Sequence, residues 1–115
     1  MPPLPPGDVE VYIAADRRAD YDALLASTRS EDRRVAAMLE KAVGVLKANP
    51  FAGDRIRRRQ IPAEYHRRYG PLENLWKFNL SRSWRLVYTV ARDAGVIVVV
   101  LEWFSHDEYE RRFGY

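Results

Sequence analysis

The sequence contains two histidines, His66 and His106, and no cysteine. Without cysteine, disulfides, cysteine-based zinc sites and thiol catalysis are excluded. His66 stands beside Arg67 and Arg68, where a protonated ring is disfavoured. His106 is predicted to open a short helix, whose dipole also favours the neutral ring. A neutral imidazole is a usable general base, and His106 is the histidine that we favour for that role.

Positively charged residues concentrate between residues 55 and 85, and nearly all of them are arginine. A planar guanidinium binds phosphate through two parallel hydrogen bonds, so this concentration predicts binding to a nucleic-acid backbone. A solvated basic loop without a ligand is the alternative interpretation. The candidate RNA-binding residues are Arg55, Arg57, Arg58, Arg59, Arg67, Arg68, Asn79 and Arg82.

Polar residues alternate with aromatic ones in the second half of the chain. Lys77, Asn79 and Arg85 occupy odd positions, whereas tryptophan and phenylalanine occupy the even positions 76, 78 and 84. Side chains alternate between the two faces of a strand, so one sheet face is expected to be polar and basic if the connecting turn keeps the alternation.

Cleaving RNA without a metal requires three kinds of group. A general base withdraws a proton from a 2′-hydroxyl, and cations stabilise the charged phosphorane. A general acid protonates the leaving 5′-oxygen. Arg85 and His106 are the principal catalytic candidates, with Lys77 in support. Tyr109 lies three residues after His106 and is expected to share its helix face, where it reaches phosphate or stacks on a base.

Other kinds of chemistry lack their sequence signals. No glycine-rich phosphate loop follows the first strand, and no histidines or carboxylates have metal-site spacing, so we expect neither a cofactor nor a metal. The apolar run Val96 to Leu101 is far too short to span a membrane, and residues 1–7 lack the features of a signal peptide. We therefore expect a cytoplasmic protein.

The 115 residues are 47% hydrophobic and 30% charged, which is typical of one globular domain. Residues 1–7 hold four prolines and are expected to form a flexible leader, with the domain over residues 8–115. The expected elements are strands at 9–14, 75–80, 84–90 and 96–104, a helix at 19–27, a second helix capped by Ser30 and ended by Asn49 and Pro50, and a terminal helix capped by Ser105. Residues 51–71 show no periodicity.

This β-α-α-β-β-β-α order predicts an α+β fold, in which an antiparallel sheet is covered on one face by a helix pair. The segment from Leu75 to Val90 resembles the second-to-third strand signature of RelE/ParE-superfamily toxins, in which a basic strand and a turn precede aromatic-Arg-Leu-Val/Ile-Tyr. The segment from Leu101 to Tyr115 is similar to RelE-like proteins that end in His-x-x-Tyr.

This resemblance implies a RelE-like mRNA interferase of a type II toxin–antitoxin system. Such a toxin cleaves ribosome-bound mRNA without metal and leaves a 2′,3′-cyclic phosphate. By motif match Arg85 stabilises the phosphate in the transition state, Lys77 is the basic strand residue, and His106 and Tyr109 are the terminal-region pair. Asn79 departs from the pattern, because RelE toxins carry a second lysine near this position.

Two alternatives share the same fold. A ParE-type inhibitor of DNA gyrase has no nuclease residues, and an inactive RNA-binding module keeps the basic face without cleavage. For the toxin, the resemblance also implies an antitoxin, an acidic or amphipathic chain laid over the helix pair and the sheet. Exposed members of the apolar stripe from Val35 to Leu46 are the expected docking surface, although core packing explains the same residues.

Overall fold

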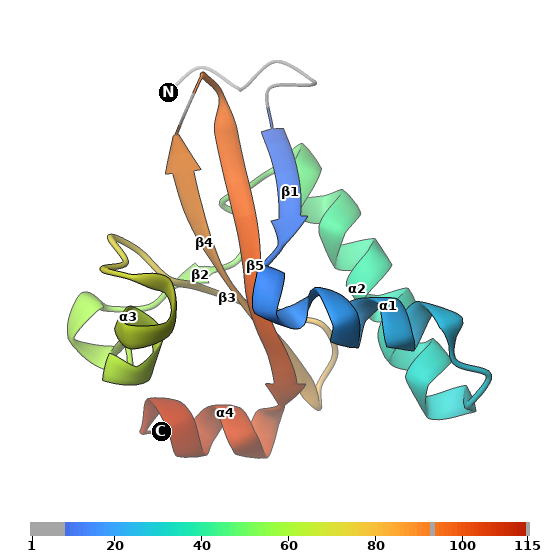
Figure 1. Cartoon of the computed structure of the whole chain (residues 1–115). Coiled ribbons are helices and arrows are strands. Elements are labelled where there is room, and N and C mark those ends of the chain that lie inside the picture. The colour runs from blue at the N-terminus through green and yellow to red at the C-terminus, as the bar shows by residue number, and fades with distance from the viewer. Residues whose placement is uncertain (1–8, 93, 115) are drawn as a thin grey trace.

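The structure is a computed structural model and describes residues 9–92 and 94–114, so the predicted leader over residues 1–7 lies outside the described residues. The described chain has an α+β fold with one mixed sheet of five strands in the order β1-β5-β4-β3-β2 (Figure 1). The strands are β1 (Val9–Ile13), β2 (Asp54–Arg55), β3 (Trp76–Asn79), β4 (Trp84–Arg92) and β5 (Val96–Ser105).

Strand direction departs from the prediction at one edge of the sheet. β2, β3, β4 and β5 pair antiparallel, but β1 runs parallel to β5. The expectation of an antiparallel sheet is therefore wrong for β1. Parallel neighbours need a long crossover connection, and here the connection includes all the elements between Ile13 and Val96.

The described residues form four helices and two short 3-10 turns. These are η1 (Ala15–Arg17), α1 (Arg18–Ala26), α2 (Ser30–Ala48), η2 (Arg58–Gln60), α3 (Ala63–Tyr69) and α4 (His106–Phe113). The helix α3 lies in the stretch that shows no periodicity, so it was not predicted.

The two predicted helix caps have different outcomes. Ser105 caps α4 as expected, because its hydroxyl accepts a hydrogen bond from the backbone N–H of Glu108 at 3.2 Å. The predicted cap Ser30 is instead the first helical residue of α2. The hydroxyl of Ser27 accepts from the backbone N–H of Arg29 at 3.1 Å and donates to Asp32 at 2.7 Å.

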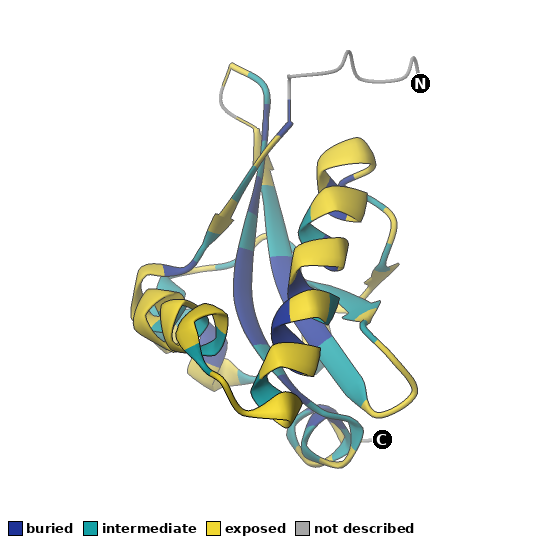
Figure 2. Ribbon diagram, turned by 90° about the vertical axis from the view of Figure 1, so that its right-hand side faces the viewer, coloured by how far each residue is buried: buried dark blue, intermediate teal, exposed yellow. Residues whose placement is uncertain are grey.

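The predicted apolar stripe of α2 packs on one face of the sheet. Figure 2 shows this helix with its buried side against the strands and its exposed side outward. Met38 is only partly buried, and the rest of the stripe belongs to the core. The buried residues on this face include Val35, Leu39, Ala42 and Leu46 of α2 and Leu86, Tyr88, Val98 and Val100 of the strands.

The opposite face is covered by α3 and α4, which lie on the viewer's side of the sheet in Figure 1. Tyr65, Tyr109 and Phe113 pack there against the strands, together with Ile56 and Ile61 from the segment before α3. The prediction of a sheet covered on one face is therefore incomplete, because two short charged helices cover part of the second face.

A β-bulge in β5 determines where its one carboxylate lies. Val87 pairs with Glu102 and Tyr88 pairs with Val100, which leaves Leu101 as the extra residue. The bulge shifts the side-chain alternation by one position. Glu102 consequently faces α3 and α4, whereas an unbroken alternation would direct it toward the apolar side of α2.

Candidate functional site

The β3–β4 hairpin brings three predicted site residues onto one face of the sheet. Asn79 pairs with Arg85 and Lys77 pairs with Val87, so the alternation continues through the turn. The turn is closed by the backbone N–H of Leu80, which donates to the carbonyl of Trp84 at 3.0 Å. Lys77, Asn79 and Arg85 thus share the face on which α4 packs, so the predicted alternation is confirmed, but the same face also carries the buried Val87 and Phe104.

The guanidinium of Arg85 is held by the turn itself. Its Nη1 donates to the carbonyl oxygens of Ser81 at 2.8 Å, Trp84 at 3.1 Å and Arg82 at 3.2 Å. No ion pair links Arg85 to a carboxylate within the described part of the chain. The guanidinium of Arg85 is therefore held at the turn, and its charge is not neutralised by a carboxylate of the described residues.

Helix α4 starts against the same turn, because the backbone N–H of His106 donates to the carbonyl of Ser83 at 2.7 Å. The Nε2 of His106 lies 2.7 Å from Oε1 of Glu110, one turn further along α4. The other ring nitrogen, Nδ1, is shielded from solvent and has no hydrogen-bond partner among residues 9–92 and 94–114. Of the two ring nitrogens, Nδ1 is thus closed to solvent and Nε2 is paired with Glu110.

Tyr109 belongs to the core, with only 2% of its surface exposed. Its ring stacks on Phe113 at 4.6 Å between centroids and meets the edge of Phe104 at 6.2 Å. The ammonium group of Lys77 lies 5.4 Å from the centre of the Tyr109 ring. This contact joins β3 to α4, but the enclosed ring has no free face on which an RNA base could stack. That predicted role is wrong.

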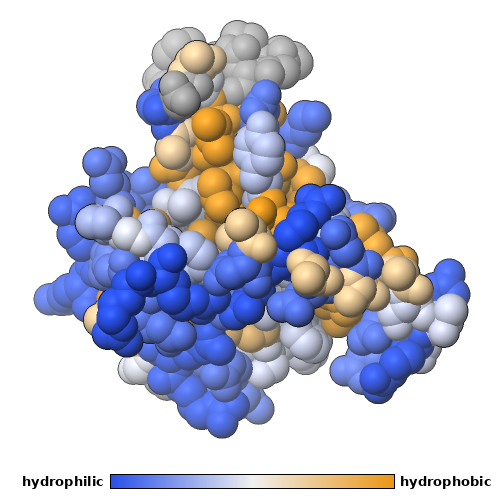
Figure 3. Space-filling model, in the orientation of Figure 1, coloured by the Kyte–Doolittle hydropathy of each residue, from blue (hydrophilic) through white to orange (hydrophobic). Residues whose placement is uncertain are grey.

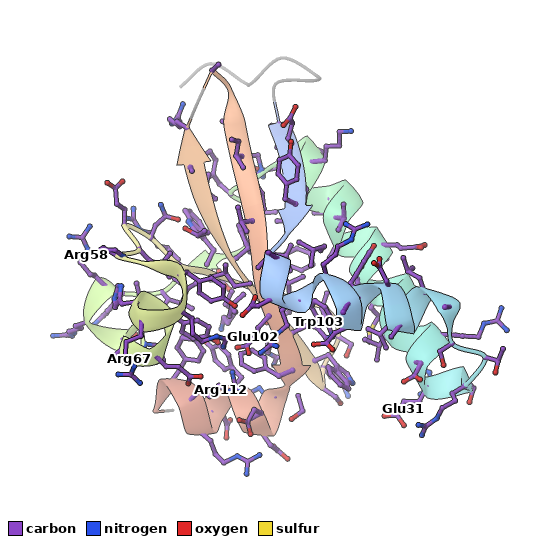
Figure 4. All side chains as sticks on the ribbon, viewed as in Figure 1. Glu31, Arg58, Arg67, Glu102, Trp103 and Arg112 are labelled. Carbon is purple, nitrogen blue, oxygen red and sulfur yellow. The ribbon has the colours of Figure 1, made fainter. Side chains whose placement is uncertain are left out.

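Most of the predicted RNA-binding arginines are exposed at the β2 edge and on α3. Figure 3 shows a hydrophilic surface over α3 and the neighbouring loops, and Figure 4 shows Arg58 and Arg67 pointing outward there. The Nη2 of Arg58 donates to the carbonyl of Glu73 at 3.2 Å. The exposed arginines of this region are Arg55, Arg57, Arg58, Arg59 and Arg67, and Arg82 is exposed in the β3–β4 turn.

Arg68 and His66 have internal contacts instead. Arg68 pairs with Asp16 at 2.7 Å, Glu102 at 3.1 Å and Glu64 at 3.6 Å, and 23% of its side chain is exposed. Its guanidinium is occupied, so we leave Arg68 out of the candidate RNA surface. The Nδ1 of His66 accepts from the backbone N–H of Leu72 at 3.1 Å, which fixes the chain after α3.

Glu102 is the buried charge that sequence reasoning missed. It is 3% exposed, and its carboxylate accepts hydrogen bonds from Tyr65 at 2.7 Å and Arg68 at 3.1 Å, as well as from Arg17 and Arg112 (Figure 4). Burial alone would raise the pKa of Glu102. The hydrogen bonds from its tyrosine and arginine partners outweigh burial and hold the pKa below its ordinary value of 4.5.

These bonds connect β5 to η1, α3 and α4, so Glu102 fixes the helices that flank the candidate site. The available sequence signal was a single carboxylate between Leu101 and Trp103 in an otherwise apolar strand. A buried carboxylate needs several donors, and the arginines of the chain are the natural source.

The structure shows no group of three or more His, Cys, Asp or Glu side chains within its described ranges that could hold a metal ion. In the same ranges no helix has the length and apolar character needed to cross a membrane. No family model, curated protein or solved structure matches the chain. The resemblance to RelE/ParE toxins therefore stays a prediction from sequence.

Proposed function

We propose that the protein is a RelE-like toxin that cleaves mRNA on the ribosome without a metal ion. The observation that supports this proposal is the shared face of Lys77, Asn79 and Arg85 beside the start of α4, where His106 lies. Two cations and an amide thus share one face of the hairpin, and His106 follows where the backbone of α4 contacts its turn. This set matches the needs of metal-free phosphodiester cleavage.

In the proposed reaction the 2′-oxygen loses its proton and attacks the adjacent phosphorus. The bond from phosphorus to the 5′-oxygen breaks, which leaves a 2′,3′-cyclic phosphate and a 5′-hydroxyl. Arg85 and Lys77 stabilise the negative charge of the phosphorane, and Asn79 donates a hydrogen bond from its amide. His106 takes the proton from the 2′-hydroxyl or returns one to the 5′-oxygen.

The pairing of His106 with Glu110 opposes this role in the conformation described. The carboxylate of Glu110 occupies Nε2, the one ring nitrogen that is not enclosed. Because Nδ1 is enclosed, the substrate must displace Glu110 from Nε2, or His106 must turn on RNA binding. The proposal therefore includes a local rearrangement at the first turn of α4.

The proposed toxin works in the cytoplasm, with mRNA, the ribosome and a cognate antitoxin as partners. The buried residues of the α2 stripe are core and do not offer a docking surface. The antitoxin is instead proposed to contact the outer side of the helix pair. A shallow groove of about 230 Å³ lies there between α1 and α2, and Leu25 beside it is 45% exposed.

Single-turnover cleavage of mRNA on programmed ribosomes tests this function. Arg85→Ala should slow cleavage by about 10²–10³-fold, which is typical for removal of one transition-state donor. His106→Gln should slow cleavage by about 10²–10⁴-fold, as expected for general acid–base catalysis. Arg34→Ala removes an exposed arginine of α2 and should have no effect.

A second candidate function is an RNA-binding module without cleavage. It is favoured by the occupied and enclosed nitrogens of His106. The same assay separates the two functions, because such a module binds RNA and produces no cyclic phosphate. Growth arrest with intact mRNA and lost gyrase activity would instead support the ParE-type alternative.

A further inference from the structure

A cavity lined by both polar and apolar residues lies away from the candidate catalytic residues. It has a volume of about 610 Å³, which is within the usual range of small-ligand sites, and it lies where the end of β4 meets the start of β3. Its lining includes Phe51, Arg55, Asn74, Trp76 and Arg92. None of the catalytic candidates lines it.

Strand register places the aromatic wall of this cavity and the catalytic residues on opposite faces of the sheet. Trp76 pairs with both Arg55 and Tyr88, so these residues share one face, whereas the next residue, Lys77, belongs to the other. The edge between the two faces is β2, followed by the exposed Arg57 and Arg59.

One wall of the cavity is aromatic and fixed in place. The rings of Phe51 and Trp76 lie 5.5 Å apart, and Trp76 stacks on the fully buried Tyr88 at 6.1 Å. The hydroxyl of Tyr88 accepts a hydrogen bond from the backbone N–H of Gly53 at 3.1 Å, which holds the loop carrying Phe51 against the sheet. The wall is thus preformed, with the rings of Phe51 and Trp76 inclined at 50° to each other.

Another part of the lining is fixed by Asn74. Its side-chain oxygen accepts from the backbone N–H of Val90 at 2.8 Å, and its amide nitrogen donates to the carbonyl of Val90, also at 2.8 Å. The hydroxyl of Thr89 donates to the backbone carbonyl of Asn74 at 2.9 Å. The loop before β3 is thus tied to β4, and the cavity does not depend on a loosely held segment.

Two cations stand at the rim. Arg55 and Arg92 are exposed, and neither is ion-paired with a carboxylate of the described residues. By contrast, Arg17 and Arg112, which contact Glu102, are committed to internal ion pairs. Among the described residues, the only acidic side chain in the lining is that of the exposed Glu73. The rim therefore offers positive charge to an anion.

We propose that this cavity binds a nucleotide, with its base against the wall of Phe51 and Trp76 and its phosphate between Arg55 and Arg92. Aromatic faces bind any base by stacking, and guanidinium groups bind phosphate in two-point contacts. The nucleotide is either free or a residue of RNA that crosses the β2 edge from the catalytic face. The RNA source rests on the proposed function, whereas the nucleotide chemistry does not.

Binding to the intact protein tests this site by calorimetry with AMP, UMP and adenosine, and by fluorescence anisotropy with a single-stranded RNA hexamer. The hexamer carries 2′-O-methyl groups, so it cannot be cleaved. The double variant Arg55→Gln/Arg92→Gln should weaken nucleotide binding at least tenfold, and Phe51→Ala about fivefold or more. Arg34→Gln/Lys47→Gln removes two exposed cations from α2 and is the charge-matched control.

A free nucleotide is the ligand if AMP or UMP binds more tightly than adenosine and the rim variant removes this difference. A residue of RNA is the ligand if the mononucleotides bind with a Kd above about 1 mM, while the rim variant binds the hexamer about tenfold more weakly than the wild type. The proposal fails if neither probe responds, or if the control weakens binding equally. If the wild-type protein shows these binding effects but does not cleave mRNA on ribosomes, the proposed function is refuted and the assignment of the cavity stands.

Discussion

Replacing Glu102 with glutamine should destabilise the protein by about 3 kcal/mol. Removing one partner of a buried ion pair typically costs about 3–5 kcal/mol, because the other charges stay buried without compensation. Here the arginine partners Arg17, Arg68 and Arg112 keep 23–31% of their side chains exposed, so water recovers part of the loss. This exposure places the expected cost at the low end of that range.

Thermal and urea unfolding measure this effect. At about 4 °C per kcal/mol for a chain of this size, Tm should fall by about 12 °C. Glu64→Gln is the matched control, since Glu64 contacts the same Arg68 at 3.6 Å but is 56% exposed. Surface pairs contribute about 1 kcal/mol or less, so the control should unfold near the wild type.

Acidity provides an independent check on Glu102. Its folded-state pKa lies below the ordinary value of 4.5, so it stabilises the fold fully above that pH. The stabilisation is lost as the pH falls below 4.5 toward the folded-state pKa. The difference in the free energy of unfolding between wild type and Glu102→Gln should therefore become smaller in acid. A difference under about 1 kcal/mol at pH 7, or one that does not change with acid, would refute the buried-charge argument.

Two further predictions concern the basic edge and the loop before β2. Arg57→Gln/Arg59→Gln should reduce the slope of log RNA affinity against log salt by about 1.4. Each phosphate that a protein neutralises on single-stranded RNA contributes about 0.7 to this slope. An unchanged slope would remove this edge from the RNA interface. Gly53→Ala should lower the free energy of unfolding in urea by about 1–3 kcal/mol, because the added carbon would clash with the carbonyl oxygen of Lys77. The control Gly44→Ala places its added carbon with no atom within 4 Å and should not destabilise the helix. Equal effects of the two substitutions would contradict the packing around Gly53.

Elements with a strong local pattern could be predicted from the sequence. The alternation through Lys77, Asn79 and Arg85 indicated both strands of the hairpin and their shared face. The apolar stripe of α2 indicated its core side, and Ser105 indicated the start of α4. In each case the residues that carry the signal also make the contacts.

Features that depend on distant partners could not be predicted. α3 has seven residues and buries only Tyr65, too little for a recognisable apolar stripe. The parallel direction of β1 depends on β5, far along the chain. Arg68 looks like any exposed arginine in the sequence, and only the fold brings Glu102 and Asp16 to it.

The position of Tyr109 was misjudged for a related reason. A tyrosine three residues after His106 shares part of its helix face, but that relation does not show which side of the helix meets the sheet. Phe104 and Phe113 enclose the Tyr109 ring, and His106 remains at the margin, with 40% of its side chain exposed.

The pairing of β1 with β5 determines when the fold can be completed during synthesis. Val9 pairs with Val96, so the partner of the first strand is made 87 residues later. At about 5–20 residues per second, a ribosome needs roughly 4–17 s to cover that distance. Throughout this interval the apolar residues of β1 lack their neighbouring strand, and closing so long a loop slows folding. The strand made first is therefore among the last to join the sheet, and a chain whose synthesis stops before β5 cannot form either the hairpin face or α4 in its final setting.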